Sequence, residues 1–541
     1  MLGLRIALSV AKGVIDEIGG LLSKLARRST YSENLADSRA IVSDIDSYDL
    51  LDKATILLTP TATSDARIHS VKTYTGDELL DVSSLSGTNW TADGSGGFTN
   101  NGSGEGLNGS LNENTIIGAT YKFTFDVTIS GIANATFGGV TIPVFTTSGS
   151  KEYYVIATSS STSFSFYLAP SGSPSMFVNN ISIVDVSSDF DFDRASSATR
   201  INSDANVEDI TSDLARINYD SNGDNGHILL EPTSTNLVPY SENFEGGSWT
   251  NESIGTTPTL EGGYTAPDGS NSAYKISNAN QDSFWYYPSV ADSDDSRTIW
   301  ARTVSGTGTA QLTSHNSNTN NTFNLTETWQ RFEVNGTTSG TGSTSFYAVD
   351  FRGSGTLTEL LVWGAQLEAL SYATSYIPTL TGSTVTRATE TLTGSGNSTL
   401  INSTEGVLYA EIAALADDGT YRELGLSDGT TSNRVLISFI NSTNQIRANF
   451  NGTGGDNLFY TVTDIKDFHK VAVKWKANDF ALWVDGVERD TDTSGSSFSS
   501  NTLNSLKFNS GVSGDKFYGK CKALAVFNEA LSDTELTNLT S

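Results

Sequence analysis

The sequence predicts a mainly β protein of tandem antiparallel jelly-roll or β-sandwich domains, with a short N-terminal α-helix. The first observation is composition. The 541 residues include 50 Gly but only 10 Pro, and charged residues make up 17%. Thr, Ser and Asn are abundant, which is typical of short strands joined by tight turns. The second is the recurrence of short segments in which apolar and polar residues alternate, the period of a half-buried strand. A chain of this length exceeds one core and holds several domains.

The charge balance excludes one class of partner. Lys and Arg total 32 against 61 Asp and Glu, a formal net charge of -29. Such a chain repels phosphates, so we expect no nucleic-acid partner. The single cysteine, Cys521, excludes an internal disulfide. No apolar run of about 18 residues is present, so no membrane-spanning helix is predicted.

Residues 1–30 form the one strongly helical segment. Its apolar residues recur at spacings that alternate between four and three: Leu4, Leu8, Ala11, Ile15, Ile18, Leu22 and Leu25. This heptad pattern predicts a helix for docking or self-association, with a trimer as the first expectation. A helix packed on its own domain is one alternative, and a membrane-surface helix, suggested by the basic residues from Lys24 onward, is another. Lys12 and Asp16 interrupt the apolar core that a signal peptide requires.

Two segments carry the alternating pattern. In residues 83–187 the apolar positions of one predicted strand are Tyr121, Phe123, Phe125, Val127 and Ile129. This segment predicts a jelly roll. In residues 237–390, Trp249 echoes Trp90, each followed by a Gly-rich turn, and similar strand-like segments follow. The second segment therefore predicts a related jelly roll.

A third segment, residues 391–541, shows the clearest strands. Trp475 and Trp483 alternate with aliphatic residues, which predicts that both indoles lie in the core. Near the end, Ser532 is followed three residues later by Glu535. This spacing predicts a short helix that begins with a capping box.

The third segment resembles laminin-G-like members of the concanavalin A-like lectin/glucanase fold. The likeness rests on FHKVAVKWKANDFALWVDGVERD (468–490) and YGKCKALAVFNEALSDTEL (518–536). It implies a laminin-G-like domain over residues 391–541, in a fold that hosts lectins, spacers and glycanases alike. The Glu-x-Asp-x-x-Glu strand of glucanases of this fold is missing, and the four histidines lie in separate segments. We therefore expect no enzyme and no catalytic residues.

A second resemblance concerns three separate stretches, residues 190–208, 215–244 and 375–390. Their motifs RASSATR, LLEP and YIPT are similar to a module recurrent in bacteriophage virion appendage proteins. In that family these strands precede or close carbohydrate-binding-like jelly rolls. The resemblance implies that residues 188–236 form a connecting β module and that residues 237–390 form a carbohydrate-binding-like jelly roll.

The same resemblance implies a structural protein on the virion surface, a head or tail fibre. Residues 1–82 would attach it to other virion proteins, with residues 31–82 as the connector, and the jelly rolls would face host surface polysaccharide. A capsid or tail decoration protein without a ligand is one alternative. A polysaccharide depolymerase is another.

One loop has the spacing of a calcium site. Within DSNGDNGHILLE, Asp220, Asn222, Asp224 and Glu231 occupy positions 1, 3, 5 and 12 of a calcium-loop pattern. Oxygen ligands at alternate positions can converge on a hard cation, so Ca²⁺ is the one candidate cofactor. The strand-like flanks and the Asp, Asn and Gly cluster fit a hairpin turn as well.

Aromatic residues of the second jelly roll are candidate glycan-binding residues. In the FWYYP segment either Phe284 and Tyr286 or Trp285 and Tyr287 point away from one face of a strand, and we take Trp285 and Tyr287 as the candidates. Trp249, which precedes a Gly-rich turn, is a third candidate. Flat rings with a polar edge can stack on sugar rings. Burial between the two sheets is the alternative for these side chains.

If the heptad pattern drives self-association, the full-length protein forms an oligomer. Removal of residues 1–30 should then reduce it to a monomer, because the apolar seam is lost. Light scattering gives both masses, and a monomeric mass for the full-length protein would contradict the prediction.

Overall fold

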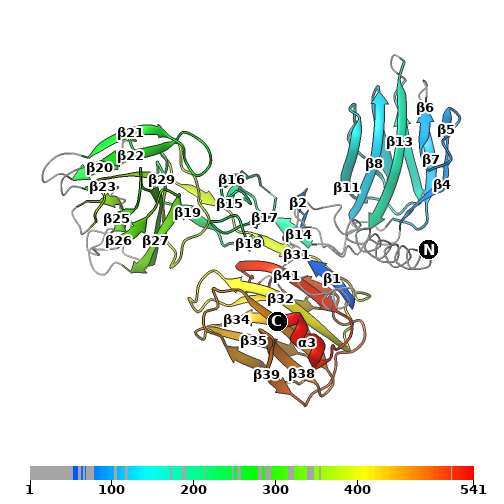
Figure 1. Cartoon of the computed structure of the whole chain (residues 1–541). Helices are drawn as coiled ribbons and strands as arrows, with labels where there is room; N and C mark the ends of the chain where they lie inside the picture. The colour runs from blue at the N-terminus through cyan, green and yellow to red at the C-terminus, as the bar shows by residue number, and fades with distance from the viewer. Residues whose placement is uncertain are drawn as a thin grey trace, which may run out of the picture. The chain divides into compact units, whose positions relative to one another are not determined.

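In a computed structural model the chain forms two compact units (Figure 1). The larger unit spans residues 1–71, 191–393 and 398–541, and the smaller unit spans residues 72–190 and 394–397. The structure describes residues 53–58, 63–64, 67–68, 78–100, 102, 106–115, 120–170, 173–185, 190–212, 214–246, 249–252, 258–277, 283–286, 294–314, 322–337, 346–351, 355–512 and 514–541. Strands dominate both units, which confirms the predicted mainly β class.

The predicted N-terminal helix and its docking residues lie outside the described residues: Leu4, Leu8, Ile15, Ile18, Leu22 and Leu25. Among the residues that are described, no helix combines the length and the apolar content needed to cross a membrane.

The smaller unit is a sandwich of two five-stranded antiparallel sheets. Its strands are β4 (Leu80–Ser86), β5 (Trp90–Ala92), β6 (Phe98–Asn100), β7 (Gly106–Leu111), β8 (Thr120–Ser130), β9 (Ala133–Phe137), β10 (Val140–Thr141), β11 (Gly149–Ile156), β12 (Ser163–Leu168) and β13 (Ser175–Asp185). The strand orders are β10-β9-β12-β7-β4 and β11-β8-β13-β6-β5.

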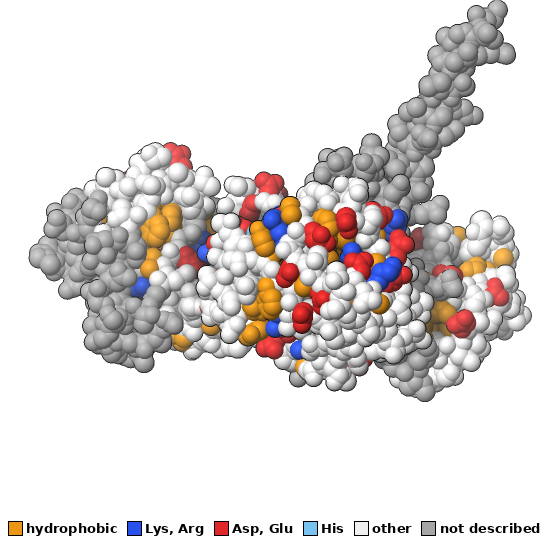
Figure 2. Space-filling view, turned by 90° about the horizontal axis from the view of Figure 1, so that it is seen from below, with side chains coloured by type: hydrophobic (Ala, Val, Ile, Leu, Met, Phe, Trp, Pro, Cys, Tyr) orange, Lys and Arg blue, Asp and Glu red, His pale blue; other side chains and the backbone are white. Residues whose placement is uncertain are grey.

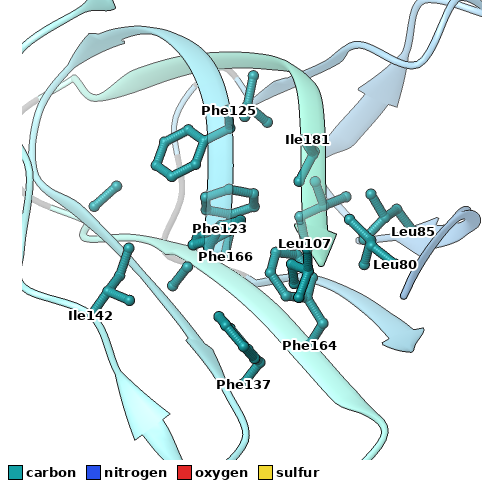
Figure 3. Packing of buried hydrophobic residues seen from close by; sticks show 14 of the residues in the cluster. Leu80, Leu85, Leu107, Phe123, Phe125, Phe137, Ile142, Phe164, Phe166 and Ile181 are labelled. Carbon is teal, nitrogen blue, oxygen red and sulfur yellow. The ribbon is translucent and has the colours of Figure 1, made fainter. Parts of the chain in front are cut away.

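The alternating pattern of the sequence places aromatic rings between these two sheets. Along β8, Tyr121, Phe123 and Phe125 are buried and the residues between them are polar, as predicted. Figure 3 shows phenylalanine rings from β8, β9 and β12 gathered with leucine and isoleucine side chains of neighbouring strands. The ring of Phe123 lies 5.6 Å from those of Phe164 and Phe166. This aromatic core holds the two sheets together.

The larger unit contains a second sandwich of two five-stranded sheets. Its strands are β20 (Trp249–Glu252), β21 (Thr259–Tyr264), β22 (Ala273–Ser277), β23 (Ser283–Tyr286), β24 (Asp294–Arg302), β25 (Gly308–Ser314), β26 (Thr322–Leu325), β27 (Gln330–Thr337), β28 (Phe346–Asp350) and β29 (Glu359–Glu368). The strand orders are β20-β23-β28-β25-β26 and β21-β22-β29-β24-β27.

The two sandwiches share one topology. If the strands of each are counted from 1 to 10, both have the orders 1-4-9-6-7 and 2-3-10-5-8. This agreement supports two related domains. However, Trp90 begins the second strand of its sandwich and Trp249 begins the first strand of the other. The tryptophan echo in the sequence therefore does not mark equivalent positions.

The turn between the second and third strands is the better sequence match. TADGS in one domain corresponds to TAPDGS in the other. Asp93 accepts a hydrogen bond from the backbone N–H of Ser95 (2.7 Å), and Asp268 accepts one from the N–H of Ser270 (2.9 Å). These carboxylates order the turns in the same way.

The C-terminal domain is a further sandwich with one short helix. Its elements are β32 (Glu405–Ala414), β33 (Arg422–Ser427), β34 (Arg434–Phe439), β35 (Gln445–Asn451), β36 (Leu458–Thr461), β37 (His469–Lys476), β38 (Phe480–Val484), β39 (Val487–Asp492), β40 (Ser505–Lys507), β41 (Gly519–Phe527) and α3 (Asp533–Thr540). Trp475 and Trp483 are buried, as predicted. The capping box is confirmed, because the Ser532 side chain accepts from the Glu535 N–H and Glu535 accepts from the Ser532 N–H.

Strands from distant segments complete this domain. β1 (Ala54–Leu58) and β18 (His227–Leu230) both pair with β41, and β17 (Arg216–Asn218) pairs with β18. The sheet order is β17-β18-β41-β32-β37-β38-β39, and its other half is β36-β35-β34-β33-β40. Figure 1 shows β1 beside β41, although they come from opposite ends of the chain. Both strands cover an edge that would otherwise expose unpaired backbone groups.

Short strands form the connecting region of the larger unit. They are β2 (Thr63–Ser64), β3 (Arg67–Ile68), β14 (Phe190–Asp193), β15 (Ala198–Ile201), β16 (Val207–Ile210), β19 (Ser234–Asn236), β30 (Val385–Arg387) and β31 (Thr391–Thr393). β15 pairs with β16 and β19 pairs with β30, and the remaining four form the sheet β2-β3-β14-β31. The region thus brings together segments that precede and follow the second sandwich.

The position of β1 predicts that Leu57→Ala destabilises the C-terminal domain. Leu57 is buried in a cluster with Leu536 of the last helix, so its loss should lower the free energy of unfolding by about 2–5 kcal/mol. Denaturant unfolding and hydrogen exchange of the β41 amides measure the effect. The exposed Val144→Ala is the control, expected within about 0.5 kcal/mol. Unchanged β41 protection in Leu57→Ala would contradict this pairing.

Candidate functional site

A buried network of charges occupies the connecting region. Arg194 Nη1 lies 2.8 Å from Glu390 Oε1, and Arg216 Nη2 lies 2.7 Å from Glu231 Oε2. Arg216 also binds Glu390, and Arg387 binds Glu231. All five side chains are buried. Three arginines therefore share two carboxylates inside the protein, an arrangement that is stable only where nearly every donor and acceptor is paired.

Backbone and hydroxyl groups add further partners, and among the described residues Arg387 Nε is a network donor without an acceptor. Ser375 donates to Glu231 from its backbone N–H (2.8 Å) and its hydroxyl (2.7 Å). The Glu231 N–H donates to Glu390 (2.8 Å), and Arg216 also donates to the Thr199 carbonyl (2.8 Å). Glu231 is thus held by at least two arginines and a serine, which explains a charged residue directly after the apolar strand β18.

The arginines control the ionisation of these carboxylates. Burial raises the pKa of Glu231, but the charges of Arg387 and Arg216 outweigh burial and lower it to about 2. Burial likewise lowers the pKa of Arg216, and Glu390 and Glu231 overcome this effect and raise it. Glu231 and Arg216 therefore stay charged and bound to each other near neutral pH.

A cavity of about 440 Å³ lies beside this network, and Glu231 forms part of its wall. Trp300 and Arg331 contribute from β24 and β27, and Lys520 contributes from β41. Residues 372–376 and the β15 hairpin close other sides. The cavity therefore forms where the second sandwich, the connecting region and the C-terminal domain meet within the larger unit.

Several polar groups around the cavity have no partner among the described residues. Trp300 Nε1, Gln330 Oε1 and Arg331 Nε are buried without a hydrogen bond. The other nitrogens of Arg331 donate to the Thr374 carbonyl (2.7 Å) and the Thr298 hydroxyl (2.9 Å). Burial lowers the pKa of Lys520, whose ammonium has no ion pair in the described part of the chain. These groups can accept a polar ligand without breaking an existing contact.

A second hollow, of about 370 Å³, lies on the smaller unit. Ser163 and Ser165 of β12 line it, and they alternate with the buried Phe164 and Phe166, so they face away from the core. Ser165 pairs with Asn108 of β7 and with Thr136 of β9. A row of hydroxyl and amide groups thus crosses three strands of one sheet.

The rim of this groove contains a tight turn, and an exposed aromatic residue lies further along the same face of β12, outside the lining. Gly138 and Gly139 have φ of +57° and +79°, which glycine adopts without strain. A Cβ atom on Gly139 would lie 2.5 Å from Ser159 Oγ, so glycine also permits the close approach. Tyr167 lies two residues after Ser165 on the same face and is 41% exposed. Hydrogen-bonding groups therefore line the groove, and an exposed ring follows two residues along β12 on the same face.

The structure does not bring the four predicted calcium ligands together. Asp220 Oδ1 accepts the backbone N–H groups of Asn222 (2.9 Å) and Asp224 (3.0 Å), which makes a hairpin turn. Glu231 is separated from them, because its carboxylate binds Arg216 in the buried network. In the described part of the chain, no three His, Cys, Asp or Glu side chains are arranged to hold a metal ion.

The structure places one predicted glycan-binding residue in the core. Trp249 is 8% exposed, its Nε1 donates to the Tyr240 carbonyl (2.9 Å), and its ring lies 4.7 Å from that of Phe244. Its ring therefore offers no free face to a sugar. Trp285 lies in β23, opposite Thr250 of β20. The Trp285 side chain and Tyr287 lie outside the described residues.

The sequence contained only part of the signal for these sites. A glutamate directly after HILL and an arginine within ARINY are charges next to apolar residues, and buried charges require partners. That pattern marks Glu231 and Arg216 as unusual but does not identify the partner of either. Arg331 and Lys520 gave no signal, because single basic residues in strands are usually exposed.

On the face shown in Figure 2, the visible basic side chains are scattered among acidic ones rather than gathered in one patch.

Comparison with known families identifies the last domain. The profile of the concanavalin A-like lectin/glucanases superfamily, of the laminin-G type, matches residues 411–537. The C-terminal domain is therefore a concanavalin A-like, laminin-G domain, as the resemblance implied. Comparison with curated protein sequences gave no match.

Solved structures match parts of the chain at low similarity. The CBM40 domain of the Ruminococcus gnavus IT-sialidase, bound to α2,3-sialyllactose, has 17% identity and a TM-score of 0.24, covering 28% of this chain and 94% of that one. The CBM22-1-CBM22-2 tandem of Paenibacillus barcinonensis Xyn10C has 12% identity and a TM-score of 0.19, covering 55% and 92%. Domains LG4-5 of the mouse laminin α1 chain have 11% identity and a TM-score of 0.18, covering 48% and 88%.

Replacing Glu231 by Gln should lower the free energy of unfolding of the larger unit by about 3–5 kcal/mol at neutral pH, because Arg216 and Arg387 lose a balancing charge. The matched control is Glu208→Gln at the part-exposed pair with Arg200, expected to cost less than about 1 kcal/mol.

The folded pKa of Glu231 is about 2, below its usual value of 4.5. Its contribution is therefore complete above that usual value and is lost as the pH falls toward 2. Denaturant unfolding should show the difference between wild type and Glu231→Gln shrinking across this window, and a constant difference would contradict the network.

Proposed function

We propose that this chain is a structural protein of a bacteriophage virion, a fibre or appendage. It attaches to other virion proteins through residues 1–82, apart from strand β1, which pairs with β41 in the C-terminal domain. It displays jelly-roll domains that bind glycans of the host surface. The domains bind polysaccharide without cleaving it. The C-terminal concanavalin A-like domain is part of the displayed region.

One observation carries the proposal. The stretches that resemble the phage appendage module supply all five residues of the buried charge network: Arg194, Arg216, Glu231, Arg387 and Glu390. Three of these residues precede the second sandwich and two follow it. The module therefore ties together the entry and the exit of a displayed domain. Its carboxylates are bound to arginines and are unsuited to acid–base chemistry, which supports a scaffold rather than an enzyme.

The groove of the smaller unit is the surface that best suits a glycan. Ser165, Asn108 and Thr136 offer hydroxyl and amide groups in one row, and these can exchange hydrogen bonds with sugar hydroxyls. Tyr167 adds an exposed ring on the same face. Single contacts of this kind are weak, and an oligomer on a particle would gain strength from many copies.

The test is binding of purified full-length protein to polysaccharide extracted from candidate host cells. The double variant Ser165→Val, Tyr167→Ala removes a hydroxyl and the ring without changing charge, and it should weaken binding about tenfold or more. Thr128→Val, on the exposed face of the other sheet, is the matched control and should bind like wild type.

Three results would count against the proposal. If the double variant binds polysaccharide as tightly as wild type, the groove is not the glycan-binding site. No binding to any host polysaccharide would favour a decoration protein without a ligand. Shortening of the polysaccharide chains during incubation would show a depolymerase and overturn the non-enzymatic role.

A further inference from the structure

We propose that the cavity beside the charge network binds an acidic sugar, with the sugar carboxylate on Arg331 and Lys520. The inference does not rest on the virion role, because it follows from the groups that line this cavity. It is also separate from the groove of the smaller unit, which lacks Lys and Arg in its lining.

Two cationic side chains of the cavity are available to an anion. Arg331 and Lys520 line the cavity without an ion pair in the described part of the chain. The lining also contains Arg200, which pairs with Glu208, and the carboxylates of Glu231 and Glu333, whose charges oppose the lowering of the Lys520 pKa by burial but form no ion pair with it. Glu231 binds Arg216 and Arg387, and Glu333 accepts hydrogen bonds from the Ala373 N–H (3.0 Å) and the Asn335 amide (2.7 Å). Arg331 and Lys520 thus present two cationic groups that form no ion pair in the described part of the chain, and together they can bind a carboxylate.

The unpaired polar atoms add hydroxyl recognition. Trp300 Nε1 and Arg331 Nε are donors without an acceptor among the described residues, and Gln330 Oε1 is an acceptor without a donor. A buried polar atom without a partner costs free energy, and a ligand that pairs it recovers that cost. A ligand that pairs the two donors and the acceptor must carry both acceptor oxygens and hydroxyl donors. An acidic sugar has both.

The size and the walls of the cavity favour a sugar over a simple inorganic anion. Its volume of about 440 Å³ falls within the usual range for small-molecule sites. Trp300, Tyr372 and Tyr376 supply aromatic surface in the lining. Aromatic surface suits the apolar face of a sugar ring and gives nothing to a phosphate ion.

Calorimetric titration of the full-length protein tests the site, with glucuronate as the probe and with glucose and inorganic phosphate for comparison. We expect glucuronate to bind at least about tenfold more tightly than either, and to bind more weakly at high salt. Lys520→Gln should reduce glucuronate affinity about tenfold or more, whereas Lys520→Arg, which keeps the charge, should retain most of it. Lys466→Gln, at an exposed lysine, removes the same charge elsewhere and should change nothing.

Trp300→Phe provides a second variant that keeps an aromatic ring in its cluster with Trp363 and Tyr376. The indole N–H is the only polar group that this substitution removes. We expect Trp300→Phe to lower the affinity for glucuronate as well. Thermal melts confirm folding of each variant, and Lys520→Gln is expected to fold because its ammonium has no ion pair to lose.

Equal affinity for glucose and glucuronate would overturn the proposal, as would unchanged affinity in Lys520→Gln. Phosphate binding as tight as glucuronate would overturn the assignment to an acidic sugar. This test is independent of the groove. If the groove does not bind polysaccharide, the titration of the cavity with free glucuronate still gives its own answer.

Discussion

The larger unit depends on the ion pairs between three buried arginines and two buried glutamates. Burying these charges is costly, and the cost is offset only when each carboxylate meets its arginines and its backbone donors together. Arg194 and Glu390 are 196 residues apart, and Arg216 and Glu390 are 174 apart. The network therefore forms only when the segments before and after the second sandwich have met. Such long-range pairing makes the unit cooperative and is expected to slow its folding.

β41 has a comparable role for the backbone. β1 and β18 lie along one of its edges and β32 lies along the other, so four distant segments share one sheet. An isolated C-terminal domain would expose that edge. The concanavalin A-like domain is thus completed by strands from outside the region that matches its family profile, residues 411–537.

Two sandwiches of one topology use opposite faces. In the smaller unit the polar groove lies on the sheet with order 1-4-9-6-7. In the larger unit Trp300 and Trp363 of the other sheet pack with Val207 and Tyr376 of the connecting region, and the cavity opens beside them. Packing against a neighbour converts an outer sheet face into the wall of a pocket. A shared fold therefore does not imply a shared site.

Local patterns in the sequence determined the β class, the buried face of β8, the core positions of Trp475 and Trp483, and the capped last helix. Each depends on residues within a few positions of one another, so spacing alone predicts it. The sequence also marks Glu231 as unusual, because a charged residue directly follows an apolar strand. Its predicted role in a calcium loop was based on spacing, whereas in the structure its carboxylate binds arginines.

The partners of Glu231, the strands that flank β41 and the meeting of Arg331 with Lys520 around one cavity were decided only by the tertiary structure. The physical reason is that charge pairing and edge pairing are set by which segments meet in space. A single sequence carries no periodicity that reports such meetings.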